Sequence, residues 1–415
     1  MMSWILTVLV SLLAIGWLWQ LAQWLMHSST LIDLNDLKKM PQEDRSSLHE
    51  PSPGRPHLTV VVPACNEQES ISTTLRSLLA SREIRLQVIA VDDRSTDRTG
   101  QIMEQIMEQI VDELRTQSIS NAGELSGGHT LEILHIQELP PGWLGKPHAL
   151  ASAARLARAD WILFTDADVT FAPETASLAL RHAQATQADH LVLMPDWTMG
   201  TPGEAAMHGA LHALSTWLMR PWRVADPEAK DSLGVGAFNL VRRSTYEALG
   251  GFDSLRMEVV EDLRFGWKLK RAGYRQCVVL GSGLASVRWS HGAWGVVRNL
   301  EKNLFALYRY RVGLTLVACL GLVIQIVLPL AALAIGGWPR VAALVLYAAV
   351  AGIYIVSQKV TRVPPAYVVL YPLAVSVFLF AMLRSLILTL VQGGVVWRGT
   401  LYSLKELRAH AGPGW

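Results

Sequence analysis

Charged side chains are scarce in this chain of 415 residues: 17% are Asp, Glu, Lys or Arg, whereas 51% are hydrophobic. Soluble globular domains carry about a quarter charged residues, so this composition favours a protein with membrane segments. The net charge of only +2 and the lack of a basic stripe argue against nucleic-acid binding. The three cysteines, Cys65, Cys277 and Cys319, lie far apart and form neither a zinc-site nor a disulfide spacing.

A glycine-rich turn is missing where a dinucleotide-binding domain would need one. The apolar run at residues 58–63 predicts a buried strand, and residues 63–67 (Pro-Ala-Cys-Asn-Glu) contain no glycine. A dinucleotide-binding domain requires Gly-x-Gly-x-x-Gly at this turn to admit the pyrophosphate. Residues 142–146 (Gly-Trp-Leu-Gly-Lys) lack the spacing of a phosphate loop. The ordinary NAD interpretation is therefore excluded.

The amino-terminal segment contains one long uncharged run. Residues 4–26 have no charged side chain and are long enough to span a bilayer. A secretory signal would have a basic region before a shorter apolar run and a small-residue cleavage site after it, so we predict a retained anchor at residues 1–27. Basic residues follow the run and none precedes it, which predicts an outward amino terminus and a cytoplasmic domain at the cell (inner) membrane. Residues 28–56 are polar and rich in proline, as is typical of a linker.

Further membrane segments are expected within residues 301–397. Residues 312–338 and 341–358 are uncharged, and Arg384 interrupts the apolar run that begins at residue 363 and continues to 397. These runs predict two spans and a third, longer and bent segment, followed by a tail at residues 398–415. A third full crossing would place the basic residues of this tail outside, against the positive-inside rule. Either the last segment re-enters the membrane or the charge rule fails at this end.

Between residues 57 and 300, apolar runs alternate with helical patterns. Strands are expected at residues 58–63, 86–91, 131–136 and 161–165, with helices at 69–81 and 148–157 among them. This alternation predicts an α/β domain with a mostly parallel sheet covered on both faces. The Ser/Gly-rich residues 117–130 are expected to form a surface loop.

Two carboxylates end the strand expected at residues 161–165. Asp166 and Asp168 lie two positions apart, so in an extended backbone they point to the same side. Adjacent carboxylates repel each other, and all-oxygen ligands suit Mg²⁺ or Mn²⁺. The alternative is a solvated turn, in which Asp is common.

Polar residues also follow the first two strands. Asn66 and Glu67 follow the first strand, and Asp92 and Asp93 follow the second. Open α/β sheets bind ligands outside the carboxyl ends of their strands, so these clusters are expected to line one crevice.

Five short motifs occur in an order that resembles family 2 glycosyltransferases with the GT-A fold, over about residues 57–300. They are residues 61–67 (Val-Val-Pro-Ala-Cys-Asn-Glu), 91–97 (Val-Asp-Asp-Arg-Ser-Thr-Asp), 145–146 (Gly-Lys), 165–168 (Thr-Asp-Ala-Asp) and 260–263 (Val-Glu-Asp-Leu). The phrase at residues 139–146 and the layout of membrane segments resemble the hopene-associated and carotenoid-associated lipid glycosyltransferases. The chain is similar, more distantly, to ceramide glucosyltransferase.

The resemblance implies roles for the donor site. The loop of Pro63, Asn66 and Glu67, together with Asp92 or Asp93, would hold the nucleotide base and ribose. The resemblance implies that Asp168, with help from Asp166, binds a Mg²⁺ or Mn²⁺ ion that bridges the donor diphosphate. Lys146 would add positive charge near the phosphates or the sugar; its alternative is an ordinary exposed lysine.

The resemblance also implies a catalytic base. In an inverting transfer one carboxylate accepts the proton of the attacking hydroxyl, and the family position assigns this role to Asp262, with Glu261 as the adjacent alternative. The simpler interpretation is an acidic pair at a helix amino terminus. His291 is a further candidate metal ligand, or a plain surface histidine.

Other features carry less information. Gly234 and Gly236 are expected where the backbone approaches a ligand closely, or at a bend of the sheet. His208 and His212 share a helical face without the glutamate of a metalloprotease, so an ordinary helix is expected. The Gln/Arg-x-x-Arg-Trp element of processive family members is absent, because residues 298–302 read Arg-Asn-Leu-Glu-Lys.

We therefore expect a membrane-integral, metal-dependent, inverting glycosyltransferase that moves a sugar from a nucleotide-sugar, such as a UDP-hexose, to a lipid hydroxyl. The alternatives are transfer to a polyprenyl phosphate or a polysaccharide, and a scaffold without activity. A scaffold would predict erosion of the acidic clusters, and none is seen.

Overall fold

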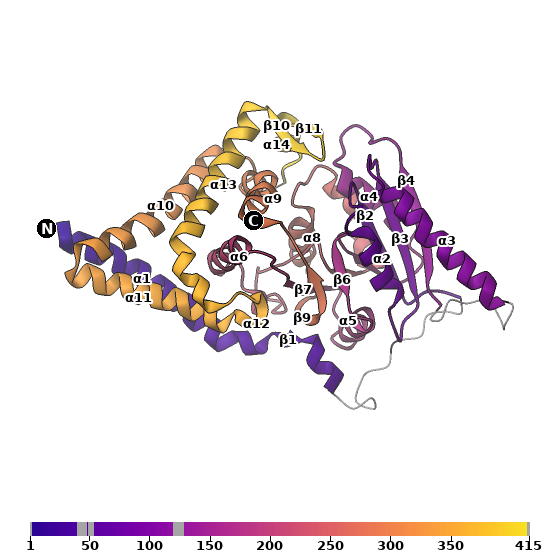
Figure 1. Cartoon of the computed structure of the whole chain (residues 1–415), viewed down its shortest axis with the longest axis horizontal. Helices are drawn as coiled ribbons and strands as arrows, with labels where there is room; N and C mark the ends of the chain where they lie inside the picture. Colours follow the sequence, from indigo (N-terminus) through magenta and orange to yellow (C-terminus); the bar gives the residue numbers. More distant parts are fainter. Residues whose placement is uncertain (1, 40–47, 49–53, 119–127, 413–415) are drawn as a thin grey trace. The chain divides into compact units, whose positions relative to one another are not determined.

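The computed structural model describes residues 2–39, 48, 54–118 and 128–412 of the chain (Figure 1). The described chain divides into two compact units that each combine several segments. Residues 32–196 and 223–288 form a unit built on a β-sheet, called here the sheet unit. Residues 1–31, 197–222 and 289–414 contribute to a mostly α-helical unit, called here the helical unit.

One mixed sheet organises the sheet unit. In the described residues it has nine strands, of which eight follow the order β1-β9-β7-β8-β5-β2-β3-β4 while β6 pairs with β9. Strands β5, β2, β3 and β4 are consecutive parallel neighbours, whereas β8 pairs antiparallel with both β5 and β7. The predicted mostly parallel α/β sheet is thus confirmed. The strands are β1 (Ile32–Asp33), β2 (Leu58–Ala64), β3 (Leu86–Asp93), β4 (Thr130–Ile136), β5 (Trp161–Phe164), β6 (Val169–Phe171), β7 (His190–Trp197), β8 (Asn239–Arg242) and β9 (Gln276–Val287).

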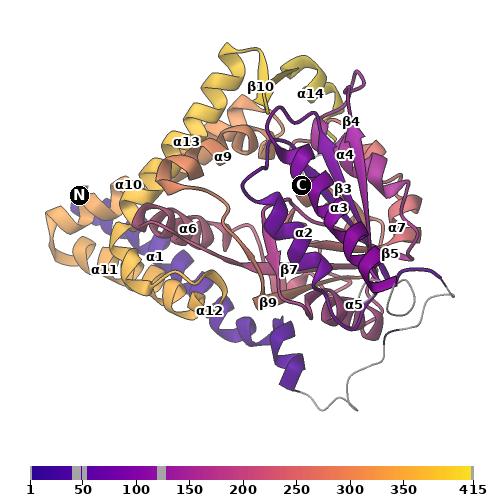
Figure 2. The same ribbon diagram turned by 45° about the vertical axis from the view of Figure 1, so that its right-hand side comes forward.

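Helices cover both faces of this sheet (Figure 2). β2 is rich in β-branched residues and almost entirely buried, as expected for a strand covered on both sides. Its neighbour β3 directs alternate side chains to opposite faces, so Asp92 lies against α3 and Asp93 against α4. The helical segments of the unit are η2 (Leu34–Lys39), α2 (Ile71–Leu79), α3 (Thr99–Ser118), α4 (Gly145–Ala154), α5 (Thr175–Ala185), α7 (Arg243–Ala248), η5 (Phe252–Leu255) and α8 (Glu261–Arg271).

The expected linker at residues 28–56 is partly regular. Residues 28–39 form η1 (Ser28–Thr30), β1 and η2, and β1 pairs in parallel with β9. Sequence polarity did not reveal this short edge strand, because its two residues have no hydrophobic pattern to detect. Residues 40–47 and 49–53 of the expected linker, and 119–127 of the expected surface loop, lie outside the described residues.

Within its described residues, the helical unit contains four helical segments that are long and apolar enough to cross a membrane, at residues 3–30, 312–335, 337–356 and 365–391. They confirm the prediction of one amino-terminal and three carboxyl-terminal membrane segments. Residues 394–397, predicted within the last segment, instead form a strand in a hairpin. The elements are α1 (Met2–His27), α6 (Pro202–Ser215), α9 (Gly292–Leu307), α10 (Val312–Ile335), α11 (Gly337–Val356), α12 (Gln358–Thr361), η6 (Pro365–Leu370), α13 (Tyr371–Val391), β10 (Gly394–Trp397), β11 (Thr400–Ser403) and α14 (Leu404–His410).

The two histidines at four-residue spacing lie on α6, as expected for an ordinary helix. The ring of His208 is 1% exposed and packs edge-on against Trp197 and Trp289. Burial lowers the pKa of His208 and of His212 to about 4, so both rings are neutral at pH 7.

Candidate active site

The carboxyl ends of β2, β3 and β5 meet at one edge of the sheet. Ala64 at the end of β2 is in register with Asp92, and Val61 is in register with Phe164 at the end of β5. The polar residues that follow each strand are therefore brought together at this edge, as the sequence predicted.

Lys146 joins two acidic segments at the start of α4. Its Nζ lies 2.6 Å from Oδ1 of Asp166 and 2.7 Å from Oε1 of Glu261. Burial opposes its charged form, but the carboxylates of Asp166, Glu261 and Asp262 raise the pKa of Lys146 well above its ordinary value. The alternative of an ordinary exposed lysine is wrong, because this ammonium is held in an ion-pair network.

The surroundings of Asp168 disfavour the ionised form of its carboxyl group. Burial, followed by the negative charges of Asp166 and Glu67, raises its pKa to about 7 from an ordinary value of 3.8. Three acidic side chains thus converge at the end of β5, while Lys146 offsets only part of their charge.

Asp262 lies in the first turn of α8, next to Glu261. Its Oδ2 accepts a hydrogen bond from the Gly236 N–H at 2.8 Å, and its Oδ1 accepts one from the Leu263 N–H at 2.7 Å. Burial, and then the charge of Glu261, raise the pKa of Asp262 to about 6. A carboxyl with this pKa is ionised at pH 7 and is a stronger base than an ordinary aspartate.

A small pocket, partly open to solvent, connects these groups. Its charged wall comes from the starts of α4 and α8 and the end of β5, and its apolar wall comes from α4, β5 and η5. The lining residues are Lys146, Leu150, Phe164, Thr165, Asp166, Gly236, Asn239, Phe252, Glu261 and Asp262.

Gly234 and Gly236 lie where neighbouring protein atoms leave no room for a Cβ. A Cβ on Gly234 would overlap the backbone carbonyl of Asp262. A Cβ on Gly236 would lie 2.5 Å from Oδ2 of Asp166 and 3.1 Å from Nζ of Lys146.

Replacing Gly236 by alanine is expected to destabilise the sheet unit by about 1–3 kcal/mol and to reduce transfer activity, because the methyl group displaces Asp166 or Lys146. Thermal unfolding and initial rates measure the two effects. Gly313→Ala is the control, since a Cβ there meets nothing within 4 Å. An unchanged Gly236→Ala variant would contradict this account.

Asp93 is the acidic residue of β3 that faces α4. Its carboxylate is 4% exposed and forms two contacts with the Arg94 guanidinium, Nε to Oδ1 at 2.7 Å and NH2 to Oδ2 at 3.0 Å. Arg94 has a φ of +57°, a conformation that L-residues adopt only when the surroundings hold them there. A Cβ on Gly145 would lie 2.5 Å from Oδ2 of Asp93, so this glycine allows α4 to begin beside the pair.

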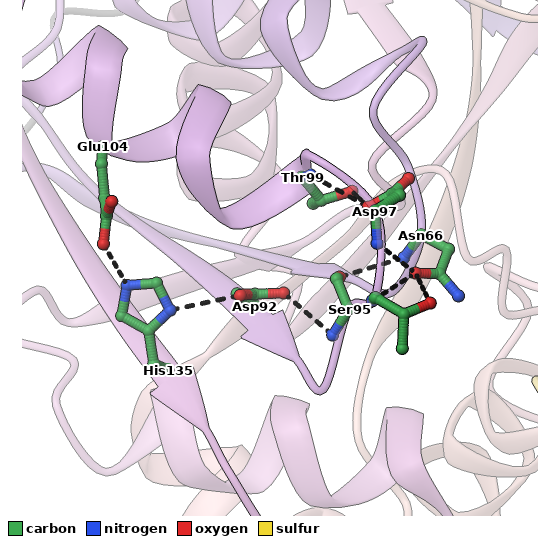
Figure 3. A network of polar contacts seen from close by, with 8 residues as sticks. Asn66, Asp92, Ser95, Asp97, Thr99, Glu104 and His135 are labelled. Carbon is green, nitrogen blue, oxygen red and sulfur yellow. Dashed lines mark hydrogen bonds and ion pairs between the residues drawn. The ribbon is translucent and has the colours of Figure 1, made fainter.

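Asp92 occupies the opposite face of β3. Its Oδ1 accepts a hydrogen bond from the Ser95 N–H at 3.3 Å, and its Oδ2 lies 3.2 Å from Nδ1 of His135 (Figure 3). Nε2 of the same histidine lies 3.3 Å from Glu104 of α3. Asp92 is therefore held by protein groups on the α3 face, whereas Asp93 shares the α4 face with Lys146.

Asn66 forms hydrogen bonds with the loop after β3. With a φ of +58°, it accepts hydrogen bonds at Oδ1 from the backbone N–H groups of Thr96 and Asp97, at 2.8 and 3.3 Å (Figure 3). Its own N–H donates to Oγ of Ser95 at 3.0 Å. These contacts join the loop after β2 to the loop after β3.

The comparisons with known proteins agree with this arrangement. Glycosyl transferase family 2 matches residues 59–250. This part of the chain is a family 2 glycosyltransferase domain.

Relatives of this glycosyltransferase domain share low sequence identity with it. The 4,4'-diaponeurosporenoate glycosyltransferase of Staphylococcus haemolyticus is 23% identical over 235 residues, 56% of each chain. That of Staphylococcus aureus is 24% identical over 210 residues, 50% of each chain. The chain thus spans about half the length of the curated relatives it matches. The mannosyltransferase PcManGT of Pyrobaculum calidifontis, solved with GDP-Man and Mn²⁺, has a TM-score of 0.51 at 20% identity, over 89% of this chain and 99% of its own, which supports the GT-A fold.

The acidic residues of the glycosyltransferase domain fit a hard divalent cation. Asp166 and Asp168 offer carboxylate oxygens at one strand end, and burial, followed by the negative charges of Asp166 and Glu67, raises the pKa of Asp168. In the described residues no three His, Cys, Asp or Glu side chains are placed to hold a metal together. In proteins Mg²⁺ is usually bound through one or two carboxylates, with phosphates and water completing its shell. His291, just before α9 in the helical unit, stays a predicted ligand.

Sequence reasoning did not identify two partners of the predicted residues. Arg94 pairs with Asp93 and has a positive φ, which no residue pattern signals. His135 could have been found from strand register, since Asp92 and His135 are paired neighbours in β3 and β4.

Proposed function

We propose that this protein is a membrane-integral, inverting glycosyltransferase that moves a hexose from a nucleotide-sugar to a lipid hydroxyl. The observation that supports it most is the pocket, which combines a carboxyl of pKa about 6 at Asp262 with the Lys146–Asp166 ion pair. Such a pocket provides a base for an attacking hydroxyl and, beside it, groups that can offset the negative charge of the phosphates.

The donor is assigned to the α4 side of the pocket. Asp93 and Arg94 lie where a nucleotide base can exchange hydrogen bonds with a carboxylate and a guanidinium. Gly145 keeps the approach between this pair and Lys146 open. Asp166 and Asp168 would hold a divalent cation, which offsets the charge that builds on the departing nucleoside diphosphate.

The acceptor is assigned to Asp262. The Gly236 N–H fixes the orientation of this carboxylate, so that it takes a proton from a hydroxyl at a defined position. Glu261 is the weaker candidate base, because its carboxylate is 5% exposed and already paired with Lys146.

The apolar helices of the same chain and the similarity to 4,4'-diaponeurosporenoate glycosyltransferases support a lipid acceptor. The basic residues after α1 support a glycosyltransferase domain on the cytoplasmic side of the cell membrane.

The test is sugar transfer by membranes that contain the full chain. Radiolabelled UDP- and GDP-hexoses are supplied, and label in the organic extract is counted with and without EDTA, followed by Mn²⁺ addition. We expect a lipid product, loss of transfer in EDTA and recovery with Mn²⁺. Transfer that EDTA leaves unchanged would contradict the metal assignment, and no transfer from either donor would contradict the function. Full activity in Asp262→Asn with a polyprenyl phosphate would favour that acceptor, because a phosphate needs no base.

A further inference from the structure

The helices α1, α10 and α11 pack against one another and define two ends of the helical unit. Near the first end, Leu6 and Val10 of α1 pack against Ala332 of α10 and Ala343 of α11. α10 and α11 are joined there by a turn at Gly336, so this end is called the turn end. α1 runs away from it, since its later residue Leu21 lies against Gly352 near the end of α11. α10 begins at this opposite end, called here the entry end.

The helix α13 starts halfway between these ends. The chain leaves α11 at the entry end and reaches α13 through α12 and η6. The first residue of α13, Tyr371, packs edge-on against Trp17 with ring centroids 5.9 Å apart. Its hydroxyl donates a hydrogen bond to Oε1 of Gln325 at 3.4 Å. Trp17 and Gln325 lie near the middle of α1 and α10, so the start of α13 is at mid-depth.

The second half of α13 returns to the entry end. Arg384 Nε lies 2.7 Å from Oε2 of Glu301, and Ser385 Oγ accepts a hydrogen bond from the Phe305 N–H at 3.0 Å. Both partners belong to α9, which ends shortly before α10 begins. α9 carries several charged side chains, which do not enter a bilayer core without high cost.

The tail that follows α13 is attached at the same end. Arg408 donates a hydrogen bond to the carbonyl of Tyr310 at 3.0 Å, and Arg309 donates one to the carbonyl of Gly412 at 3.0 Å. Tyr310 lies two residues before Val312, where α10 begins. A crossing α13 would instead deliver the tail to the turn end, about 36 Å away along a 24-residue helix.

We propose that α13 does not cross the membrane but is a one-leaflet helix, bound to the acyl chains of the leaflet at the entry end. In both views α13 runs across the direction of α1 and α11 instead of along it (Figures 1 and 2). Leu373, Phe380 and Ile387, at seven-residue spacing, are 63%, 47% and 55% exposed and form one uncovered apolar stripe. The opposite face of α13 is buried. Lipid of a single leaflet is the occupant that fits this stripe.

This topology also removes the conflict in the charge pattern. With α13 in one leaflet, the tail residues Arg398, Lys405 and Arg408 share the side of Lys359 and Arg362. All five basic residues then obey the positive-inside rule. The contacts of α13 and the charge pattern are independent observations that agree.

Cysteine labelling tests the side of the tail. Cys65, Cys277 and Cys319 are replaced by alanine in the full chain, and single cysteines are introduced by Ala409→Cys, Lys359→Cys or Trp338→Cys. Intact right-side-out and inside-out vesicles are treated with a membrane-impermeant maleimide. We expect Ala409→Cys and Lys359→Cys to react in the same vesicle type and Trp338→Cys in the other. Labelling of Ala409→Cys together with Trp338→Cys would overturn the proposal.

A second measurement does not depend on removing cysteines. An epitope after Trp415 of the otherwise unaltered chain is exposed to protease in both vesicle types, beside antibody detection of the sheet unit. Cleavage of both in one vesicle type supports a one-leaflet α13, whereas cleavage in opposite types refutes it.

Depth along α13 gives a further readout. Nitroxide labels at Leu373→Cys, Phe380→Cys and Val391→Cys in the cysteine-free chain report their depth through collisions with oxygen and a water-soluble nickel complex. We expect depth to be greatest at residue 373 and to fall steadily toward 391. A maximum at 380, with shallow positions on both sides, would identify a crossing helix and reject the proposal.

Discussion

Replacing Asp262 by asparagine is expected to lower kcat by about 10²–10⁴-fold with a hydroxyl acceptor, the usual contribution of a positioned general base. Asparagine keeps the shape, and its single amide oxygen can accept from the Gly236 N–H or from the Leu263 N–H but not from both; it cannot take a proton. The KM for the nucleotide-sugar is expected to change little, because Asp262 contacts the acceptor in the proposed mechanism. Initial rates with saturating donor measure the effect.

The pH profile gives this prediction an independent check. The ionised form of Asp262 is the active one, so wild-type kcat/KM is expected to fall tenfold per unit as the pH drops below about 6. The residual kcat/KM of Asp262→Asn should not show this decrease below about pH 6. Glu228→Gln, on the surface of the same unit, is the control and should retain wild-type rates. A wild-type rate in Asp262→Asn with a hydroxyl acceptor would exclude Asp262 as the base.

The raised pKa of Asp262 also predicts how the stability of the protein depends on pH. Between pH 3.8 and about 6 the folded protein keeps on Asp262 a proton that the unfolded chain has already lost. The free energy of unfolding therefore decreases as the pH rises through this window. Asp262→Asn removes this electrostatic cost at pH 7 but leaves one of the two backbone N–H donors without its acceptor, so Tm is measured beside activity, and a large fall in Tm would attribute lost activity to misfolding.

Replacing Asp168 by alanine is expected to reduce transfer by at least about a hundredfold, because a divalent cation contributes several kcal/mol to stabilising the leaving group. The variant should also lose the rise in Tm that Mn²⁺ gives the wild-type protein, since ligand binding to the folded state stabilises it. Without metal, however, Asp168→Ala is expected to be more stable than wild type. The substitution removes a carboxylate whose burial and whose neighbours Asp166 and Glu67 raise its pKa to about 7.

Asp160→Ala is a matched control, because Asp160 precedes the other end of the same strand, β5, and its side chain is 73% exposed. Its activity and its response to Mn²⁺ should equal those of wild type. A Tm increase with Mn²⁺ that survives in Asp168→Ala would show that the cation binds elsewhere.

Much of the fold could be predicted because strands and spans leave local patterns. Uninterrupted apolar runs such as residues 58–63 identified buried parallel strands, and charge-free runs of bilayer length identified the membrane segments. The short edge strand β1 escaped prediction, since its pairing with β9 depends on residues more than two hundred positions away.

The candidate site was predicted in composition but not in detail. The strand-end carboxylates could be predicted from the sequence, because parallel strands bring their carboxyl ends together, whereas Asp262 was assigned from the resemblance to the family. Only the tertiary structure distinguished the surroundings of Asp93 from those of Asp92. The two residues are adjacent in a strand and therefore face different helices. The tertiary structure also showed that Lys146 is paired with two carboxylates, which shifts its role from surface charge to the centre of the pocket.

For the membrane topology, too, the sequence determined one part and the tertiary structure another. The sequence by itself determined that the last apolar segment conflicts with the distribution of basic residues, because hydrophobicity and charge are properties of residues in order. Whether that segment crosses depends on which surfaces its ends contact. Only the tertiary contacts of Arg384 with Glu301 and of Arg408 with Tyr310 decided that both the end of α13 and the tail lie where α10 begins.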